Sequence, residues 1–114
     1  MKEFMMIFVG GDYESKEMSP EDFQRRMGKW QEWVDQLKKD DLFIDGRALK
    51  NASSRISGVD QLVTDGPFVE IKELVTGYFI IKARDLAHAS SLTDGYPDYD
   101  LNGQVEIREI ETFS

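Results

Sequence analysis

The sequence of 114 residues has no cysteine and a single histidine, His88. Without thiols the chain can form no disulfide framework, no thiolate nucleophile and no sulfur-ligated zinc site. A nucleophilic triad also lacks support, because one imidazole is present and no G-x-S-x-G motif accompanies it.

Long apolar runs and basic residues are also scarce. The longest apolar run near the start, Phe4–Val9, is far too short to span a membrane and does not resemble a signal peptide. The 14 basic residues are outnumbered by 22 acidic ones, which gives a formal charge of −8. This balance disfavours binding to nucleic acid and to anionic lipid. We therefore expect a cytoplasmic protein with neither nucleic acid nor membrane among its partners.

Apolar and aromatic residues are plentiful. They make up 40% of the chain by the usual hydrophobic set and include seven Phe, four Tyr and two Trp. A chain of this size and composition can bury a core without disulfides or metal. With no long repeat and no low-complexity segment, we predict one domain over residues 1–114.

The first half of the chain predicts a strand, a helix and a second strand. Phe4–Val9 is strand-like and is ended by two glycines. Ser19 and Pro20 are typical of a helix start, and the helix should continue to about Asp40. The second strand is predicted at 42–44, bent at 45–46 and continued by 47–50. The helical face is marked by apolar residues at spacings of three and four, namely Phe23, Met27, Trp30, Val34 and Leu37, widened by Trp33.

The second half predicts a polar loop followed by two strands, a helix and a last strand. The loop is expected at 51–58, the helix at 86–93, and the strands at 59–64, 77–83 and 104–111. This order favours an α+β fold with two helices on one face of an antiparallel sheet. Residues 4–9 and 78–81 are apolar on both faces of their strands. Two helices cover only one face, so we expect a homodimer that pairs the uncovered sheet faces.

Four stretches of the chain resemble the YCII-related family, specifically its DGPF-motif branch. They read SPEDFQRRMGKWQEWVDQL, TDGPFVEIKE, GYFIIKARDLAHA and VEIREI. The resemblance implies a ferredoxin-like α+β fold, a dimeric α/β-barrel arrangement, and a cleft near the DGPF corner of each subunit. Some members are proposed enzymes with a His–Asp pair whose His lies on the first helix. Here that helix carries Trp30 and Trp33 instead, so the catalytic His is not carried over.

The DGPF corner and its surroundings contain the candidate site residues. We predict Asp65 and Glu70 as catalytic acid–base groups, because a buried carboxylate can be tuned toward neutral pH. Arg47 could orient an anionic ligand, with Trp30 and Phe68 lining the cleft. A structural interpretation stays open for each: Asp65 can cap a turn, Phe68 can fill the core, and Arg47 can pair with either carboxylate.

The segment from Asp98 to Glu109 matches D-x-D-x-N-G-x₅-E, the calcium-loop pattern. Pro97 prevents an entering helix, and the alternation over 104–111 indicates a strand where the exiting helix should be. We therefore predict no metal site, and leave open only a looser one from Asp98, Asp100 and Asn102.

Two functional hypotheses follow. The first is a protein that binds a small polar molecule near the DGPF corner, either with or without acid–base catalysis, and that uses no cofactor. The second is a non-catalytic dimeric interaction or regulatory module. The family branch is sometimes linked to sigma factors, which points to signalling or transcription.

Overall fold

The computed structural model of the chain describes residues 1–13, 17–66 and 70–113. Its regular elements are β1 Lys2–Val9, α1 Pro20–Lys39, β2 Phe43–Ala48, β3 Ser53–Ser57, β4 Leu62–Gly66, the 3₁₀ turn η1 Ile71–Glu73, β5 Val75–Ala83, α2 Leu86–Ser91, the 3₁₀ turns η2 Leu92–Gly95 and η3 Tyr99–Leu101, and β6 Gln104–Glu109.

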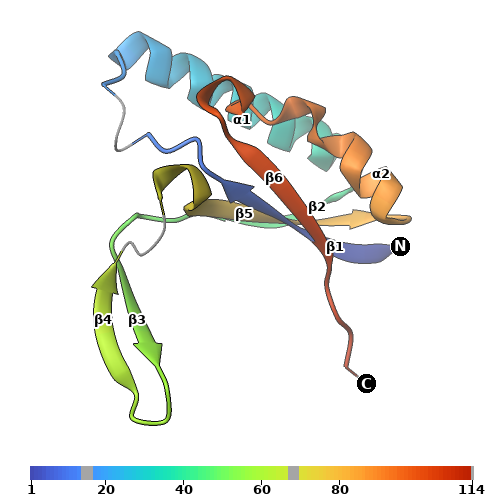
Figure 1. The fold of residues 1–114 in the computed structure, drawn as a ribbon. Helices are drawn as coiled ribbons and strands as arrows, with labels where there is room; N and C mark the ends of the chain where they lie inside the picture. Colours follow the sequence, from blue (N-terminus) through green and yellow to red (C-terminus); the bar gives the residue numbers. More distant parts are fainter. Residues whose placement is uncertain (14–16, 67–69, 114) are drawn as a thin grey trace.

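The main sheet has four antiparallel strands in the order β2-β5-β1-β6. Both helices lie over one face of this sheet (Figure 1). Without the inserted β3–β4 hairpin, the chain order is strand, helix, strand, strand, helix, strand. This order and pairing are those of a ferredoxin-like fold, so the predicted α+β class is confirmed.

Helix α1 begins and ends where its sequence signals lie. The Ser19 side chain accepts a hydrogen bond from the Asp22 backbone N–H at 3.1 Å, and Pro20 occupies the first helical position. Lys38 and Lys39 lie in the last turn, where cations are favoured by the helix dipole.

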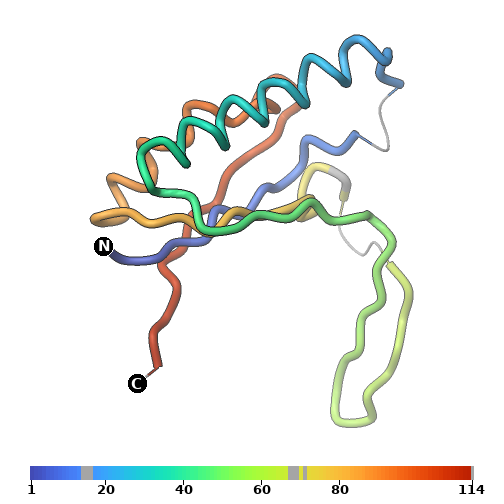
Figure 2. Tube along the Cα trace, turned by 180° about the vertical axis from the view of Figure 1, so that it is seen from behind, coloured from blue at the N-terminus to red at the C-terminus, as the bar shows by residue number. Residues whose placement is uncertain are grey.

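Figure 2 shows both helices on the same side of the sheet. The buried side chains of the core fill the space between the helices and the sheet. Every second residue of β1 points into it, and Phe4, Met6 and Phe8 are all buried. Phe8 is the centre of an aromatic cluster in which its ring lies 4.9–5.8 Å from four others, those of Trp30, Trp33, Phe79 and Tyr96. This cluster joins α1 and the segment after α2 to the middle of the sheet.

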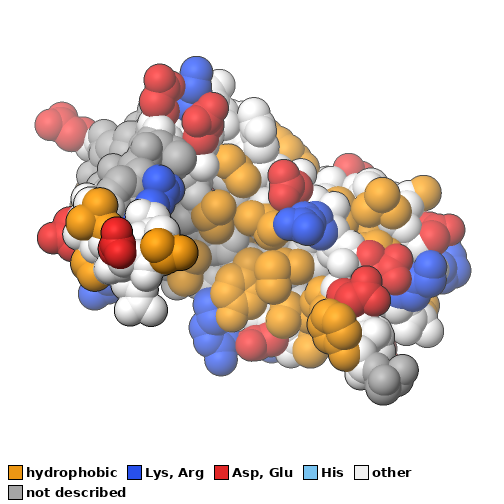
Figure 3. Space-filling view, turned by 60° about the horizontal axis from the view of Figure 1, so that its bottom comes forward, with side chains coloured by type: hydrophobic (Ala, Val, Ile, Leu, Met, Phe, Trp, Pro, Cys, Tyr) orange, Lys and Arg blue, Asp and Glu red, His pale blue; other side chains and the backbone are white. Residues whose placement is uncertain are grey.

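The opposite face of the sheet, which we term the open face, has none of the described helices over it. Its central rows are apolar and half-buried, and consist of Met5, Ile7 and Val9 from β1 with Tyr78 and Ile80 from β5. Figure 3 shows hydrophobic side chains gathered across this side, with charged side chains around them.

The predicted loop at 51–58 is wrong, because Ser53–Ser57 forms β3 and pairs with β4 as a separate two-stranded hairpin. The sequence Ser-Ser-Arg-Ile-Ser lacks the apolar alternation by which strands are recognised. Its register is fixed by a tight connection in which Gly58 and Gln61 both take positive φ. The hairpin extends from the body on the side away from the helices (Figures 1 and 2).

The second helix is shorter than predicted. Asp85 caps α2 by accepting the His88 backbone N–H at 2.8 Å, but the helix changes to a 3₁₀ turn at Leu92. Only Ala89 is buried within it, because its residues are mostly polar or small. None of the helices in the described ranges is long and apolar enough to cross a membrane.

Candidate functional site

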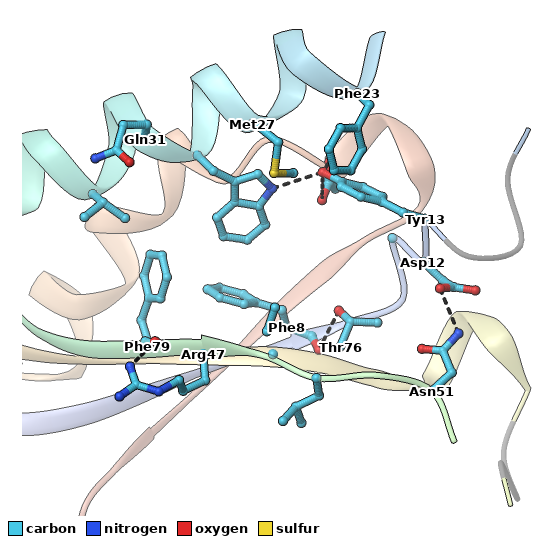
Figure 4. A pocket seen from close by; sticks show the side chains of 18 residues that line it. Phe8, Asp12, Tyr13, Phe23, Met27, Gln31, Arg47, Asn51, Thr76 and Phe79 are labelled. Carbon is cyan, nitrogen blue, oxygen red and sulfur yellow. Dashed lines mark hydrogen bonds between the residues drawn. The ribbon is translucent and has the colours of Figure 1, made fainter. Parts of the chain in front are cut away.

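A cavity of about 600 Å³, which we term the α1 cavity, lies between α1 and the sheet. That volume is within the range of small-molecule sites, roughly 300–1,000 Å³. Figure 4 shows Phe23 and Met27 of α1 on one side and Phe8 and Phe79 of the sheet on the other. Its lining also includes Gly11, Asp12, Tyr13, Trp30, Gln31, Val34, Gly46, Arg47, Ala48, Leu49, Asn51, Thr76, Gly77 and Asp98.

The apolar stripe of α1 is divided between the core and this cavity. Trp33 and Leu37 are buried, as the periodicity predicts. Phe23 and Met27 are 44% and 37% exposed and line the cavity. Large apolar side chains in this position form a wall that a ligand of similar polarity can cover.

One end of the cavity is polar. The polar end consists of Asp12, Tyr13, Asn51 and Asp98. The Tyr13 hydroxyl lies 2.8 and 2.9 Å from the two carboxylate oxygens of Asp98 and donates to them. It accepts a hydrogen bond from Trp30 Nε1 at 3.0 Å. These side chains come from segments as much as 85 residues apart, and α1, the β1–α1 connection and the segment before β6 together position them.

A glycine pair turns the chain into the polar end. Gly10 and Gly11 follow β1 and have φ of 74° and 61°. A Cβ at Gly11 would lie 3.0 Å from the Tyr96 hydroxyl and 3.1 Å from Asp98 Cβ. Only glycine tolerates both the positive φ and this approach, which places Asp12 and Tyr13 at the cavity. Asp12 is buried and accepts from Asn51 Nδ2 at 2.9 Å.

Arg26 closes the network behind the polar end. This buried guanidinium donates to Asp98 Oδ1 at 3.1 Å. It binds Asp100 through two parallel hydrogen bonds of 2.8 Å and contacts Asp22 at 3.4 Å. In the described part of the chain, every fully buried side-chain nitrogen and oxygen has a hydrogen-bond partner. The network is therefore satisfied internally and holds Asp98 in one position.

The pKa values of two carboxylates in this network, Asp98 and Asp100, are shifted in opposite directions. Burial raises the pKa of Asp98 above its usual range, although Tyr13 and Arg26 favour its charged form. The exposed Asp100 has a lowered pKa because Arg26 binds it directly. Burial also raises the pKa of the Tyr13 hydroxyl, which keeps it a neutral donor near pH 7. Asp98 thus takes up a proton more readily than Asp100 of the same network.

The residues predicted as a site are only partly brought together. Trp30 and Arg47 both line the α1 cavity. The Arg47 side chain is 65% exposed and pairs with Asp45. Asp65 is exposed on the hairpin strand β4, and Glu70 is 74% exposed and lies 3.4 Å from Lys72. Neither acid lines the cavity, so their catalytic roles stay predictions.

Phe68 lies outside the described residues. The structure adds four residues to the candidate site. Asp12, Tyr13 and Asp98 line the cavity, and Arg26 binds Asp98. Of these only Asp98 stood out in the sequence, through the calcium-loop pattern. Arg26 is buried on the apolar side of an amphipathic helix, where a charged residue is unusual. This unusual position is the feature of the sequence that could have identified Arg26.

The calcium-loop segment is arranged around Arg26. Residues 99–101 form η3, and Asn102 adopts a left-handed conformation with φ of 60°. The carboxylates of Asp98 and Asp100 both bind the Arg26 guanidinium, which compensates part of their negative charge. Among the described residues no group of three or more His, Cys, Asp or Glu is placed to hold a metal ion.

Comparison with known proteins identifies the family. A search of curated proteins finds none that matches this chain. The family model described as the YCII-related domain matches residues 6–114, which include both helices, all of the strands except the start of β1, and every residue that lines the α1 cavity. The chain therefore belongs to the YCII-related family.

Proposed function

We propose that the protein binds a small molecule in the α1 cavity. The observation that carries this proposal is a cavity of about 600 Å³ with apolar walls and a buried, rigidly held carboxylate at one end. Converging polar groups in an otherwise apolar cleft are the usual form of a ligand site.

Acid–base chemistry in this cavity would be the task of Asp98. Its raised pKa brings it closer to neutral pH than an exposed acid. Tyr13 would keep the carboxylate oriented through its two short contacts. Asp65 and Glu70 could act only on a ligand that reaches beyond the cavity lining.

Substituting Ala48→Trp is expected to block binding. Ala48 is exposed on the edge strand β2 and lines the cavity, so an indole there fills its entrance without disturbing the core. The neutral fluorophore N-phenyl-1-naphthylamine should bind the wild-type protein saturably at one site per chain. Its affinity should fall roughly tenfold or more in the variant.

The matched control is Ser54→Trp, which adds the same indole to an exposed position of the hairpin. It should bind the fluorophore like the wild-type protein. Saturable binding that Ala48→Trp leaves unchanged would place the ligand elsewhere, and no saturable binding at all would contradict the proposal.

The open face supports a homodimer. Its apolar central rows, bordered by charged residues, have the composition of an interface core with a polar rim. Ile80→Arg, in the middle of this face, is expected to convert a two-chain species into single chains, measured by sedimentation equilibrium. Ser54→Arg, at an exposed polar position of the hairpin, is the control and should stay dimeric. A wild-type protein that sediments as one chain would contradict the dimer.

The second candidate function, a non-catalytic interaction or regulatory module, is favoured by the hairpin. Its apolar side chains are all more than half exposed, and they are Ile56, Val59, Leu62 and Val63. Such a group is typical of a contact surface. The fluorophore assay separates the two candidates, because an interaction module requires no ligand in the α1 cavity.

A further inference from the structure

The β3–β4 hairpin is regular but has no buried side chain to support it. Every residue from Ala52 to Asp65 is exposed, although the two strands pair along their length. A two-stranded hairpin by itself is marginally stable in water and needs a surface to pack against. Because this stretch buries no side chain against the body of its own chain, we expect its packing surface to lie in another molecule.

One face of the hairpin is suited to such packing. Ile56 and Val63 lie directly opposite each other in the register, so their side chains point to the same face. They are 59% and 61% exposed. Nearer the body, the same face carries the polar residues Ser54 and Asp65. The apolar contact is therefore confined to the half of the hairpin near its tip, where Val59 is fully exposed.

The hairpin projects on the side of the sheet where the open face lies (Figures 1 and 2). It is inserted between β2 and β5, so it starts and ends at one end of the sheet. Its strands have five residues each, which span roughly 16 Å at about 3.3 Å per residue. Sheets that stack face to face lie about 10 Å apart. The hairpin is thus long enough to pass beside a sheet that packs on the open face.

The open face indicates which molecule the hairpin meets. Its central rows are apolar, and the homodimer proposed above pairs this face with the same face of a second copy. In a two-fold dimer each chain presents both an open face and a hairpin, so two equivalent hairpin contacts form. A different protein bound to the hairpin would have to share the space beside the open face with that second copy.

We propose that the β3–β4 hairpin is a dimerisation arm, whose Ile56–Val63 face packs against the second copy of the chain that covers the open face. The inference rests on the proposed homodimer and goes beyond it, because pairing of the sheet faces does not by itself require the hairpin. It also assigns a partner to the apolar side chains that favour an interaction module. Burial of these side chains in both arms supplies the packing that the isolated hairpin lacks.

Photo-crosslinking tests where the arm lies. The chain has no cysteine, so Val59→Cys labelled with benzophenone-4-maleimide places one photoreactive group at the hairpin tip. Nitrogen-14 and nitrogen-15 protein are mixed, allowed to exchange subunits, irradiated and digested. Mass spectrometry should find peptide pairs that join the hairpin of one isotope to a peptide of the other. Ile80→Arg, which separates the chains, should abolish these pairs, and the same label at Glu32→Cys, an exposed position of α1, should give none.

Sedimentation equilibrium measures what the arm contributes to association. The double variant Ile56→Ala, Val63→Ala should raise the dissociation constant of the dimer roughly tenfold or more, because it removes apolar area from both arms. Leu86→Ala is the matched control, since it truncates a side chain that is 55% exposed on α2, on the other side of the sheet. It should leave the dissociation constant unchanged.

The outcomes separate the arm from the dimer. A wild-type protein that sediments as one chain would refute the homodimer and the arm with it. A dimer in which the Val59 label crosslinks only within one chain would overturn the arm while leaving the dimer. A dissociation constant that the double alanine variant does not change would also overturn the arm, because the hairpin would then contribute nothing to association.

Discussion

Phe8→Ala is expected to lower the free energy of unfolding by about 3–5 kcal/mol. Phe8 is 3% exposed, and its ring lies 4.9 Å from that of Phe79 and 5.0 Å from that of Trp30. The substitution removes both the burial of a phenyl ring and the edge contacts that add to it. The space left is bounded by other large rings that cannot all move inward, so a cavity remains. Urea unfolding followed by Trp fluorescence measures the change.

Two further variants calibrate this loss. Phe113→Ala removes the same ring from a position that is 91% exposed, and should change stability by about 0.5 kcal/mol or less. Phe8→Leu keeps most of the volume and should cost less than the alanine variant. If Phe8→Ala were no more harmful than Phe113→Ala, Phe8 would not be the centre of the core.

Arg26→Ala is expected to destabilise the protein by about 3–5 kcal/mol at pH 7. The cause is the removal of the guanidinium from a carboxylate that is almost fully buried, since Asp98 is 3% exposed. Such a charge has neither water nor a cation to compensate it. The matched control is the next residue, Arg25, whose side chain is 58% exposed and pairs with Asp22. Arg25→Ala should cost about 1 kcal/mol or less.

The effect of Arg26→Ala should depend on pH in a definite direction. The pKa of Asp98 is already raised by burial, and loss of Arg26 raises it further, so the folded variant binds a proton more readily than the unfolded chain. Its stability then falls as pH rises from the usual range of a carboxyl through the raised pKa. Arg26 also lowers the pKa of Asp100, and this interaction stabilises the folded wild-type protein at neutral pH. The wild type loses that stabilisation on acidification. Both changes make the variant's deficit largest at pH 7 and smaller near pH 4.

Urea titrations of both arginine variants at these two pH values provide the measurement. The double variant Arg26→Ala, Asp98→Asn should recover part of the loss at pH 7, because the unpaired charge is gone. A deficit that is equal at both pH values, or equal to that of Arg25→Ala, would show that Asp98 is not an uncompensated buried charge in the variant.

The body of the fold could be predicted from the sequence because its signals are local. Ser19 and Pro20 define the start of α1, and the runs in β1 and β5 are too short and too apolar for surface helices. The hairpin could not be predicted in full. Strand β3 is made of exposed, mostly polar residues, and its pairing with β4 supplies the regularity that its sequence lacks.

The candidate site was less predictable because its contacts are not local. Trp30 could be expected at a wall, since it belongs to the apolar stripe of α1. The pairing of Arg26 with Asp98 joins residues 72 positions apart, and that of Tyr13 with Asp98 joins residues 85 apart. No spacing rule within one element connects them. The DGPF corner drew attention as a motif, yet its acid Asp65 belongs to the exposed hairpin.

The central position of β1 affects the order in which the chain can fold. Its partners are β5 and β6, and the register joins Lys2 to Ala83 and Phe4 to Glu109. During synthesis β1 therefore cannot pair with a neighbouring strand until Val75–Ala83 has left the ribosome. The four-stranded sheet is complete only when β6 follows. Helix α1, complete much earlier, is the element able to cover the apolar side of β1 in the meantime. An amphipathic helix that directly follows an apolar, aggregation-prone strand thus protects the nascent chain and also forms part of the finished fold.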